Sequence, residues 1–303
     1  MRLNSNFIKK LAVDVGFQDC GIAKAEFMNN EFTRFTDSIK SHKHAEMAFL
    51  ERNIENRFNP SSLLPNCKSV IVVTYNYLTA SQQKSSLYRT AKYTWITDYH
   101  ILVNNLLQVV ADRLIEVMPM MNYKITVDSS TISEKNWAVR AGIGCFGKNG
   151  LIHNDKGSFF VIGTLLIDQI CDNYDTPHQF SDCGNCNLCV NNCPTNAITE
   201  PFKVDATKCI SYLNTEYKTP DFNNLAKEKF IFGCDICQDV CPKNKKIVPN
   251  LTNELKTSLF LPLENADYES LTEDDFRRLF KDTSIFRRKY QRFRKIIDAK
   301  RDF

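Results

Sequence analysis

The chain is of medium length, moderately apolar and weakly basic. It has 303 residues, of which 43% are hydrophobic and 24% are charged, and a formal net charge of +4 at pH 7. This apolar fraction supports a real core, in one large domain or two modest ones. No run of about 18 apolar residues is present, which excludes a membrane-spanning helix. The charged first 26 residues lack the apolar run of a signal peptide, so we expect a cytoplasmic protein.

Helical and strand patterns alternate up to about residue 170. Apolar residues at helical spacing predict helices over residues 4–16, 45–57, 99–118 and 133–141. Runs of β-branched and aromatic residues predict strands over residues 20–25, 69–77, 123–128 and 158–167. This alternation predicts an N-terminal α/β or α+β domain.

A cysteine-rich segment follows, and eight of the twelve cysteines lie between Cys183 and Cys241. The first run reads CGNCNLCVNNCP from Cys183, the second reads CDICQDVCP from Cys234, and Cys209 stands between them. The first run has the bacterial ferredoxin spacing for 4Fe-4S clusters, in which the fourth cysteine serves the other cluster. The chain is therefore expected to transfer single electrons.

The spacing also assigns the ligands. We define the cluster 1 group as the CxxCxxC thiols with the last cysteine of the second run, namely Cys183, Cys186, Cys189 and Cys241. The cluster 2 group holds the remaining cysteines, namely Cys193, Cys209, Cys234 and Cys237. Zinc is an alternative, because paired CxxC motifs also form tetrahedral sites. A disulfide framework fits a non-secreted chain less well. The other cysteines are expected to be ordinary core or surface residues: Cys20, Cys67, Cys145 and Cys171.

The end of the chain is basic. After a segment with lysines and prolines (242–249) and an acidic segment (264–275), residues 287–301 hold one acid and eight basic residues: Arg287, Arg288, Lys289, Arg292, Arg294, Lys295, Lys300 and Arg301. Apolar positions from Ile285 to Ile297 suit one helix face. Two interpretations stay open, a solvated terminal helix and a phosphate-binding surface for nucleic acid.

A glycine-rich stretch, GIGCFG at residues 142–147, matches GxGxxG. The dinucleotide fingerprint needs a strand before it and a helix after it, and here the predicted order is the reverse. We expect instead a turn whose glycines let a large ligand approach the backbone.

Residues 127–149 carry the most specific pattern, VDSSTISEKNWAVRAGIGCFGKN. It resembles the VD(S/T)xPxxExxWAxRAGLGxxGKN motif of the epoxyqueuosine reductase family. Further stretches resemble that family at residues 55–65, 92–100 and 209–213, and the resemblance covers roughly residues 5–298. It implies an α+β fold: an N-terminal α/β cobalamin-binding domain of nitroreductase-like layout (1–175), a ferredoxin-like domain with two 4Fe-4S clusters (176–250), and a basic helical tail (251–303).

The resemblance also implies a reaction, the reduction of the epoxide of epoxyqueuosine at the tRNA wobble position to queuosine. Cobalamin is expected beside cluster 1, and electrons from an external flavodoxin- or ferredoxin-type donor are expected to pass through cluster 2, then cluster 1, then cobalt. Asp128 matches the proton donor, which requires a raised pKa from burial. Its alternative role is to cap the following turn.

Expected cofactor-pocket residues are Arg57, Lys148, Asn149 and Ser211, with Trp95, Tyr99 and Trp137 as possible walls. No DxHxxG signature is present, so His100 and His153 are not expected to ligate cobalt. Longer family members carry a C-terminal helical-repeat module, and we expect this protein to resemble the shorter members without it. We therefore expect tRNA to contact Arg287, Arg288, Lys289, Arg292, Arg294 and Lys295, helped by Lys243, Lys245 and Lys246.

The chain is expected to act as a monomer. Three alternatives to the reductase remain open. The first is a reductive dehalogenase-like cobalamin and iron–sulfur reductase of a small molecule, although no twin-arginine signal opens the chain. The second is a two-cluster electron carrier without cobalamin, and the third a zinc-stabilised RNA-binding protein.

Overall fold

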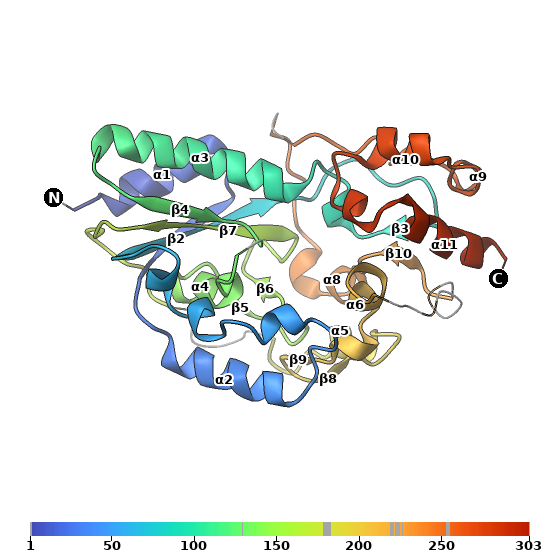
Figure 1. Cartoon of the computed structure of the whole chain (residues 1–303), viewed down its shortest axis with the longest axis horizontal. Helices are drawn as coiled ribbons and strands as arrows, with labels where there is room; N and C mark the ends of the chain where they lie inside the picture. Colours follow the sequence, from blue (N-terminus) through green and yellow to red (C-terminus); the bar gives the residue numbers. More distant parts are fainter. Residues whose placement is uncertain are drawn as a thin grey trace.

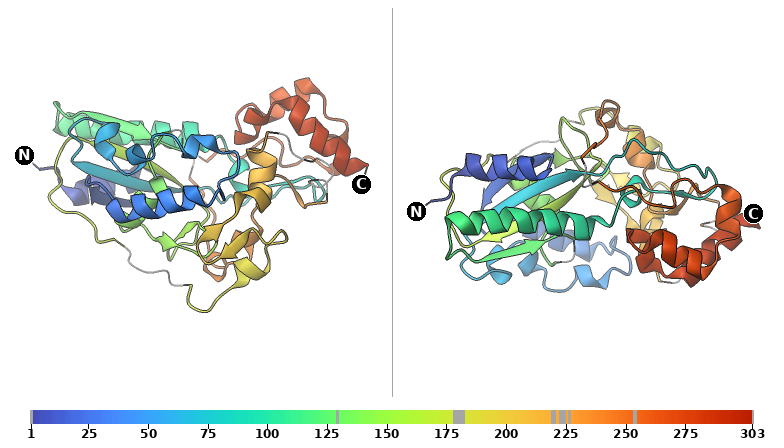
Figure 2. Two further views of the ribbon diagram at one scale, coloured as in Figure 1. Left: turned by 60° about the horizontal axis from the view of Figure 1, so that its bottom comes forward. Right: turned by 90° about the horizontal axis from the view of Figure 1, so that it is seen from above.

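The structure, a computed structural model, describes residues 2–128, 130–177, 183–218, 221, 225, 227–252 and 255–302. It is elongated, with the N-terminal sheet and its helices at one end and the C-terminal helices at the other (Figures 1 and 2). The cysteine-bearing segments lie between these two ends (Figure 1). Among the described residues, no helix is long and apolar enough to cross a membrane.

The helices of the described residues are α1 (Ser5–Val15), α2 (Asn29–Lys40), α3 (Tyr99–Val117), α4 (Glu134–Arg140), α5 (Leu188–Asn191), α6 (Ile210–Thr215), α8 (Ile236–Asp239), α9 (Asn265–Glu269), α10 (Glu273–Phe280) and α11 (Tyr290–Arg301). The strands are β1 (Asp19–Lys24), β2 (Ser69–Asn76), β3 (Arg89–Thr90), β4 (Tyr123–Thr126), β5 (Cys145–Phe146), β6 (Ile152–His153), β7 (Phe160–Ile167), β8 (Ile198–Glu200), β9 (Lys203–Val204) and β10 (Phe230–Phe232). Short 3-10 turns lie at Ala48–Leu50, Glu55–Arg57, Pro60–Ser62, Lys92–Thr94, Ala206–Lys208, Pro242–Asn244 and Ser284–Arg288.

A four-stranded antiparallel sheet in the order β1-β2-β7-β4 forms the centre of the N-terminal part. Every residue of β2 is buried, because both faces of the sheet are covered. Ile71 and Val73 join the core under α1 and α3, whereas Val70 and Val72 join the core under α4 (Figure 1). This two-sided burial explains why β2 reads as a continuous apolar run. At Gly163 in β7, an added Cβ would lie 2.6 Å from Val103 Cγ1, so glycine permits the close packing of α3.

The expected elements are largely confirmed. All four predicted strands and the helices predicted at 4–16, 99–118 and 133–141 occur within two residues of their expected ends. The helix predicted over 45–57 is wrong: two 3-10 turns replace it, and Ala45 and Asn53 have φ of 55° and 48°, which no right-handed helix accepts.

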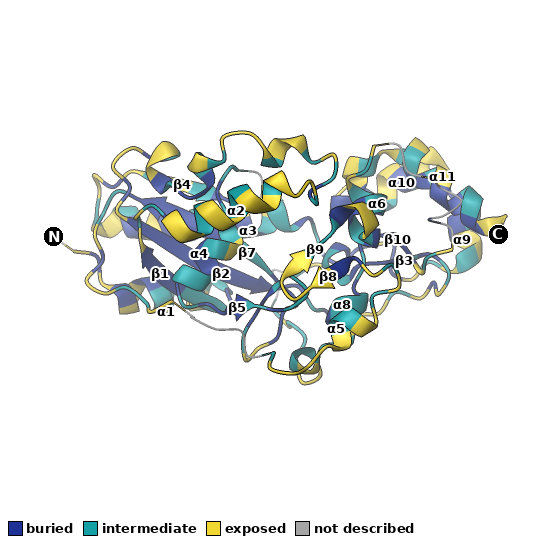
Figure 3. Cartoon of the chain, turned by 90° about the horizontal axis from the view of Figure 1, so that it is seen from below, coloured by how far each residue is buried: buried dark blue, intermediate teal, exposed yellow. Residues whose placement is uncertain are grey.

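Helix α2 was not predicted from the sequence. It has no buried residue, yet its apolar residues recur on one face, so the periodicity that predicts a helix is present in this segment. Its outer face is exposed in Figure 3, and only partly buried residues such as Phe32 and Phe35 pack inward.

The C-terminal helices share a core with an earlier segment. Strand β3 pairs in parallel with β10, and Tyr88 and Trp95 belong to the same buried cluster as Phe276, Phe280 and Phe293. Helix α11 begins at Tyr290, because the preceding residue, Lys289, has a φ of 59° that interrupts the expected single helix from Ile285.

Candidate functional site

A cavity of about 2270 Å³ opens between the sheet and the cysteine-bearing segments. Drug-sized ligands occupy about 300–1,000 Å³, so this cavity admits a much larger group. Its walls come from α2, the segment 130–136, the start of β7, the hairpin β8–β9 and the loop around α6. The site is therefore assembled from segments far apart in the sequence.

The thiols of the cluster 1 group lie near one another. Burial raises the pKa of the Cys189 thiol, and the neighbouring thiols of Cys183, Cys241 and Cys186 raise it further. The pKa of Cys241 is likewise raised by burial and then by Cys183 and Cys186. Cys186 is exposed, so this group reaches the protein surface.

The cluster 2 group forms a second, separate set. Burial raises the pKa of Cys234 to about 12, with contributions from the nearby thiols of Cys209 and Cys193. Burial also raises the pKa of Cys237, and Cys234 and Cys209 add to that rise. All four cysteines line the cavity. Cys209, assigned by elimination, thus lies with the three cysteines it was expected to join.

Among the described residues, no three His, Cys, Asp or Glu side chains converge closely enough to hold a single metal ion.

The sequence led us to expect cobalamin beside cluster 1. In the structure the cluster 2 cysteines line the cavity, and the cluster 1 cysteines do not. Cys209 at the start of α6 and Cys237 on α8 both belong to this wall. Spacing within the two runs carries no information about this orientation.

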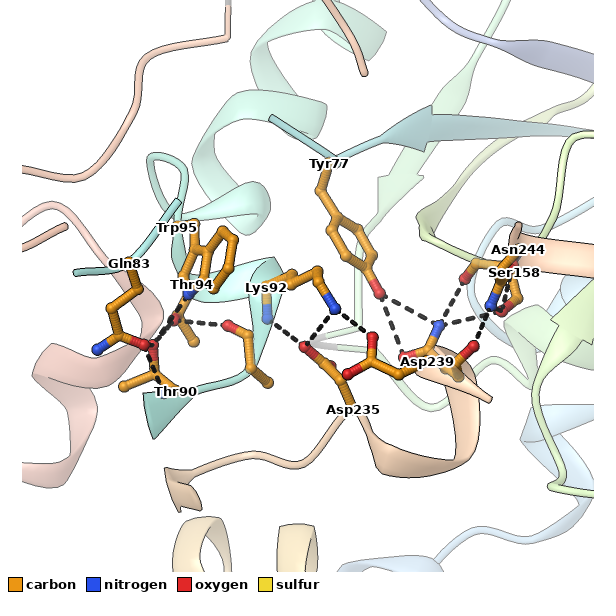
Figure 4. A network of polar contacts seen from close by, with 12 residues as sticks. Tyr77, Gln83, Thr90, Lys92, Thr94, Trp95, Ser158, Asp235, Asp239 and Asn244 are labelled. Carbon is orange, nitrogen blue, oxygen red and sulfur yellow. Dashed lines mark hydrogen bonds and ion pairs between the residues drawn. The ribbon is translucent and has the colours of Figure 1, made fainter. Parts of the chain in front are cut away.

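Helix α8 is held to the N-terminal part by a polar network (Figure 4). The Lys92 backbone N–H donates to Asp235 Oδ2 at 2.7 Å, and Lys92 Nζ lies 3.8 Å from the same oxygen. Burial raises the pKa of Asp235 to about 6, although Lys92 opposes that rise. Gln238 Nε2 donates to the Ser158 carbonyl at 2.9 Å, and Tyr77 contacts the same amide. These bonds place Cys237 of this helix, and Cys234 just before it, against the cavity.

Asp128 lies two residues after the end of β4 and faces the cavity. Its φ is 53°, a left-handed conformation that is uncommon for residues other than glycine. Tyr99 Oη donates to Oδ2 at 2.7 Å, and His100 Nε2 lies 3.5 Å from the same oxygen. The Asp128 backbone N–H donates to Glu134 Oε1 at 2.7 Å. Three side chains therefore hold this residue in place.

The expected raised pKa of Asp128 is wrong for this arrangement. The hydrogen bond with His100 lowers the pKa, and the bond from Tyr99 also lowers it, against the opposing effect of burial. The side chain remains 62% exposed because it faces the cavity. By contrast, the pKa of the neighbouring Glu134 carboxyl is raised, because burial disfavours its charged form and Asp128 adds like charge.

His100 is the partner that sequence reasoning missed. Burial alone would lower its pKa, but hydrogen bonds with Asp128 and Asp98 outweigh burial and raise it. Nδ1 lies 2.6 Å from Asp98 Oδ1, and Arg287 Nη2 lies 3.7 Å from the other oxygen of Asp98. The signal was present in the family-like stretch 92–100, which contains Asp98 and His100.

Three of the four expected pocket residues line the cavity: Arg57, Asn149 and Ser211. Arg57 is buried, and its Nη2 donates to the Phe49 carbonyl at 2.6 Å. Its Nε is buried without a hydrogen-bond partner among the described residues, and burial lowers the pKa of the guanidinium. Asn149 hydrogen-bonds the thiol of Cys237, so it touches both the cavity and the cluster 2 group.

Lys148 and two of the expected aromatic walls lie elsewhere. Lys148 does not line the cavity, because its Nζ donates at 2.8 Å to Asn187 Oδ1 in the cluster 1 loop. Tyr99 lines the cavity as expected. Trp95 and Trp137 are buried core residues instead.

At two glycines of the glycine-rich turn, the space beside the backbone is filled by another residue of the protein, so it is not open to a ligand. An added Cβ at Gly144 would lie 2.4 Å from the His153 carbonyl oxygen. One at Gly147 would lie 2.9 Å from Cδ2 of the same imidazole. The expectation that these glycines open the backbone to a large ligand is therefore wrong, and their role is to make room for His153.

Much of the basic tail is engaged inside the protein. Arg288 Nε donates to the Asn214 carbonyl at 2.7 Å, and burial lowers the pKa of Arg288 to about 9. Arg294 Nη1 donates to the Glu269 carbonyl at 2.7 Å. Other basic residues of the tail are exposed, among them Arg287, Lys289 and Lys295. The choice between a solvated helix and a phosphate-binding surface therefore concerns the exposed basic residues of the tail.

Comparisons with known proteins agree with this geometry. Residues 57–129 match the family model described as epoxyqueuosine reductase QueG, DUF1730. Residues 182–244 match the 4Fe-4S double cluster binding domain, so the cysteine-rich segment is one that binds two 4Fe-4S clusters.

Several relatives align with most of the chain. An epoxyqueuosine reductase of Cyclobacterium marinum is 35% identical over 302 residues, covering 97% of this chain and 96% of the relative. That of Escherichia coli is 34% identical and covers 92% of this chain and 76% of the relative. A solved epoxyqueuosine reductase with an epoxyqueuosine-modified tRNA-Tyr stem loop has a TM-score of 0.86 at 25% identity, covering 97% of this chain and 80% of that one. A catabolic reductive dehalogenase shares the fold alone, with a TM-score of 0.52 at 16% identity over 79% of this chain and 32% of that one.

Proposed function

Since the chain belongs to the epoxyqueuosine reductase family, we propose that it reduces the epoxide of epoxyqueuosine in transfer RNA to the alkene of queuosine. One observation carries the proposal. The four cluster 2 cysteines and the Asp128 carboxylate line the same cavity, so electrons and protons can reach one substrate from its two walls.

The reaction takes up two electrons and two protons and releases the epoxide oxygen as water. Asp128 Oδ2 is the atom in the cavity that can hand a proton to that oxygen. Because its pKa is lowered, the proton it donates has to be supplied by a neighbour. His100, with a raised pKa and Nε2 3.5 Å away, is that neighbour, and Tyr99 fixes the position of the carboxylate.

The cavity also fits cobalamin, which we propose as the cofactor. Its size suits a large group rich in amide and phosphate acceptors, as does the buried Nε of Arg57, which has no hydrogen-bond partner in the described part of the chain. Arg57, Asn149 and Ser211 would hold it. When bound, cobalamin supplies an electron-rich metal centre for reducing the epoxide.

We propose that electrons enter at cluster 1 and reach the cavity through cluster 2. Support comes from the exposed Cys186 and from the cluster 2 cysteines in the cavity wall. Lys245 and Lys246 are exposed next to Cys241, so an acidic flavodoxin- or ferredoxin-type donor suits this face.

We divide the roles of the chain among three segments. Residues 1–175 supply most of the cavity wall, residues 176–250 hold the clusters, and residues 251–303 form the tail. Because one chain supplies the cavity and both cysteine groups, we propose a monomeric enzyme that meets its tRNA in the cytoplasm. Exposed Arg287, Lys289 and Lys295 are proposed to contact tRNA phosphates, while Arg288, Arg292 and Arg294 shape the tail.

The test is a reconstituted assay. The chain is prepared without oxygen, supplied with iron, sulfide and cobalamin, reduced chemically, and given a stem loop that carries epoxyqueuosine. We expect a nucleoside that is lighter by one oxygen atom, seen by mass spectrometry only when cobalamin is present. Full iron loading without turnover, and without cobalamin binding, would instead identify an electron carrier.

A further inference from the structure

His153 lies between the glycine-rich turn and the cluster 1 loop. It belongs to β6 and pairs across the hairpin with Cys145 of β5. The side chain is 4% exposed, so bulk water competes little for its hydrogen bonds. Gly144 and Gly147 leave the space that its backbone and ring occupy. Packing against this turn therefore fixes the position of the His153 imidazole.

That place is beside a predicted cluster ligand. His153 Nε2 lies 3.7 Å from Cys183 Sγ, within the range of an N–H···S hydrogen bond. The same nitrogen lies 3.8 Å from Cys145 Sγ. The thiol of Cys145 also lies 3.9 Å from the His153 carbonyl oxygen, to which it can donate. One ring nitrogen thus stands between two sulfur atoms of different chemistry.

The two sulfur atoms differ as acceptors. Cys183 as a cluster ligand is a thiolate, whereas Cys145 belongs to neither cysteine group and its thiol can donate to the His153 carbonyl oxygen. A hydrogen bond to a charged acceptor is roughly twice as strong as one between neutral groups. The Nε2–H of the imidazole therefore favours Cys183 and is shared in part with Cys145.

We propose that His153 is a positioning residue that donates Nε2–H to the Cys183 sulfur and thereby raises the reduction potential of cluster 1. Reduction adds negative charge to the cluster and its sulfur ligands, and a donor aimed at a ligand sulfur stabilises that charge. A higher potential eases uptake of the first electron from an external donor. The proposal rests on the ligand assignment in the proposed function.

Cys145 gives the proposal a second, opposite consequence. When its sulfur is removed, Nε2–H loses one competing acceptor, and the bond to Cys183 strengthens. Replacing the histidine and replacing the cysteine should therefore shift the same potential in opposite directions. A merely structural role for either residue predicts no such pair of shifts.

The experiment is a redox titration of both clusters, followed by electron paramagnetic resonance in the chain loaded with iron and sulfide. The variants are His153→Phe, which removes the donor, His153→Gln, which retains an N–H donor, and Cys145→Ala. A Cys189→Ala sample, which lacks one cluster 1 ligand, assigns the two signals. Cluster 2 serves as the reference within each sample.

We expect His153→Phe to make the cluster 1 midpoint potential more negative, His153→Gln to restore part of the shift, and Cys145→Ala to make it more positive, with cluster 2 unchanged. Unchanged cluster 1 potentials in His153→Phe and Cys145→Ala, with both clusters present, overturn the proposal. If the His153→Phe variant loses cluster 1, the sign of the shift in the cluster 1 midpoint potential of Cys145→Ala tests the proposal instead. A shift that is not positive then overturns it. A Cys189→Ala sample that keeps both cluster signals intact overturns the ligand assignment instead.

Discussion

His100 stands between two carboxylates, with Nε2 3.5 Å from Asp128 Oδ2 and Nδ1 2.6 Å from Asp98 Oδ1. Asp98 and His100 are largely buried, whereas the Asp128 side chain faces the cavity. The imidazole can therefore pass a proton to the cavity through a carboxylate that is itself ionised. Orientation of the ring by Asp98 keeps Nε2 directed at Asp128.

Asp128→Asn should lower turnover by at least about 100-fold, because general acid catalysis contributes roughly 10²–10⁴. The amide still accepts the bond from Tyr99, so the fold and the iron content should be unchanged. Single-turnover conversion of the modified stem loop, measured with iron and cobalt content, is the test. Near-normal conversion by this variant would remove Asp128 from the reaction.

Turnover should depend on pH through His100. Its pKa is raised above the ordinary value of about 6.5. Its proton is thus present below that value and is lost as pH rises through the higher folded-state pKa. We expect the rate to fall over that alkaline range in the natural chain.

The variant His100→Gln tests this assignment. Glutamine cannot titrate, so the rate should be lower throughout, and the alkaline decline should disappear. An unchanged pH profile in this variant would place the titrating group elsewhere.

The sequence predicts the parts of the site that are local in the chain. Both cysteine groups follow from spacing, because a cluster ligand set is largely contained in short runs. The family-like motif led directly to Asp128, since the motif itself carries the residue. The central sheet is predicted well for a similar reason, because burial on both faces of β2 leaves a continuous apolar run.

What the sequence does not predict depends on contacts between distant segments. Which cysteine group lines the cavity depends on how Cys209 and Cys237 face it. The lowered pKa of Asp128 depends on His100, which is 28 residues away in the chain and reaches it only through packing of α3 beside β4. Lys148 looked like a pocket residue, yet its amine reaches the cluster 1 loop.

Glu134 should hold the loop at Asp128 in position through a hydrogen bond. Its Oε1 accepts the backbone N–H of Asp128, which has a positive φ. Leaving that N–H without a partner costs about 1–3 kcal/mol, so Glu134→Ala should lower kcat roughly tenfold or more by depopulating the productive loop position. Glu134→Gln retains a carbonyl acceptor and should keep most activity. An equal loss of activity in both variants would show that the charge of Glu134 is required, rather than its hydrogen bond to the Asp128 N–H.

Lys92 should stabilise the contact between α8 and the N-terminal part. Asp235 is buried, and Lys92→Met would leave its carboxyl without the nearby charge. Breaking such a pair costs about 3 kcal/mol. We expect faster loss of the cluster absorbance on warming. Lys84→Met, which breaks the exposed pair with Glu264, is the matched control and should have no measurable effect. Equal behaviour of the two variants would contradict the anchoring role.

Substitutions in the tail should affect tRNA binding differently, depending on whether the basic residue is exposed or is held by a backbone carbonyl. Lys289 and Lys295 are exposed, and replacing both with Gln should reduce the salt dependence of stem-loop binding by roughly 0.7 in logarithmic slope for each phosphate that the variant no longer neutralises. Arg288 is held by the Asn214 carbonyl, so Arg288→Met should lower the unfolding temperature and leave that slope unchanged. Affinity measured at several salt concentrations distinguishes these effects. If Arg288→Met flattens the slope as much as the double variant does, the engaged arginine also contacts phosphate, and the division of the tail is wrong.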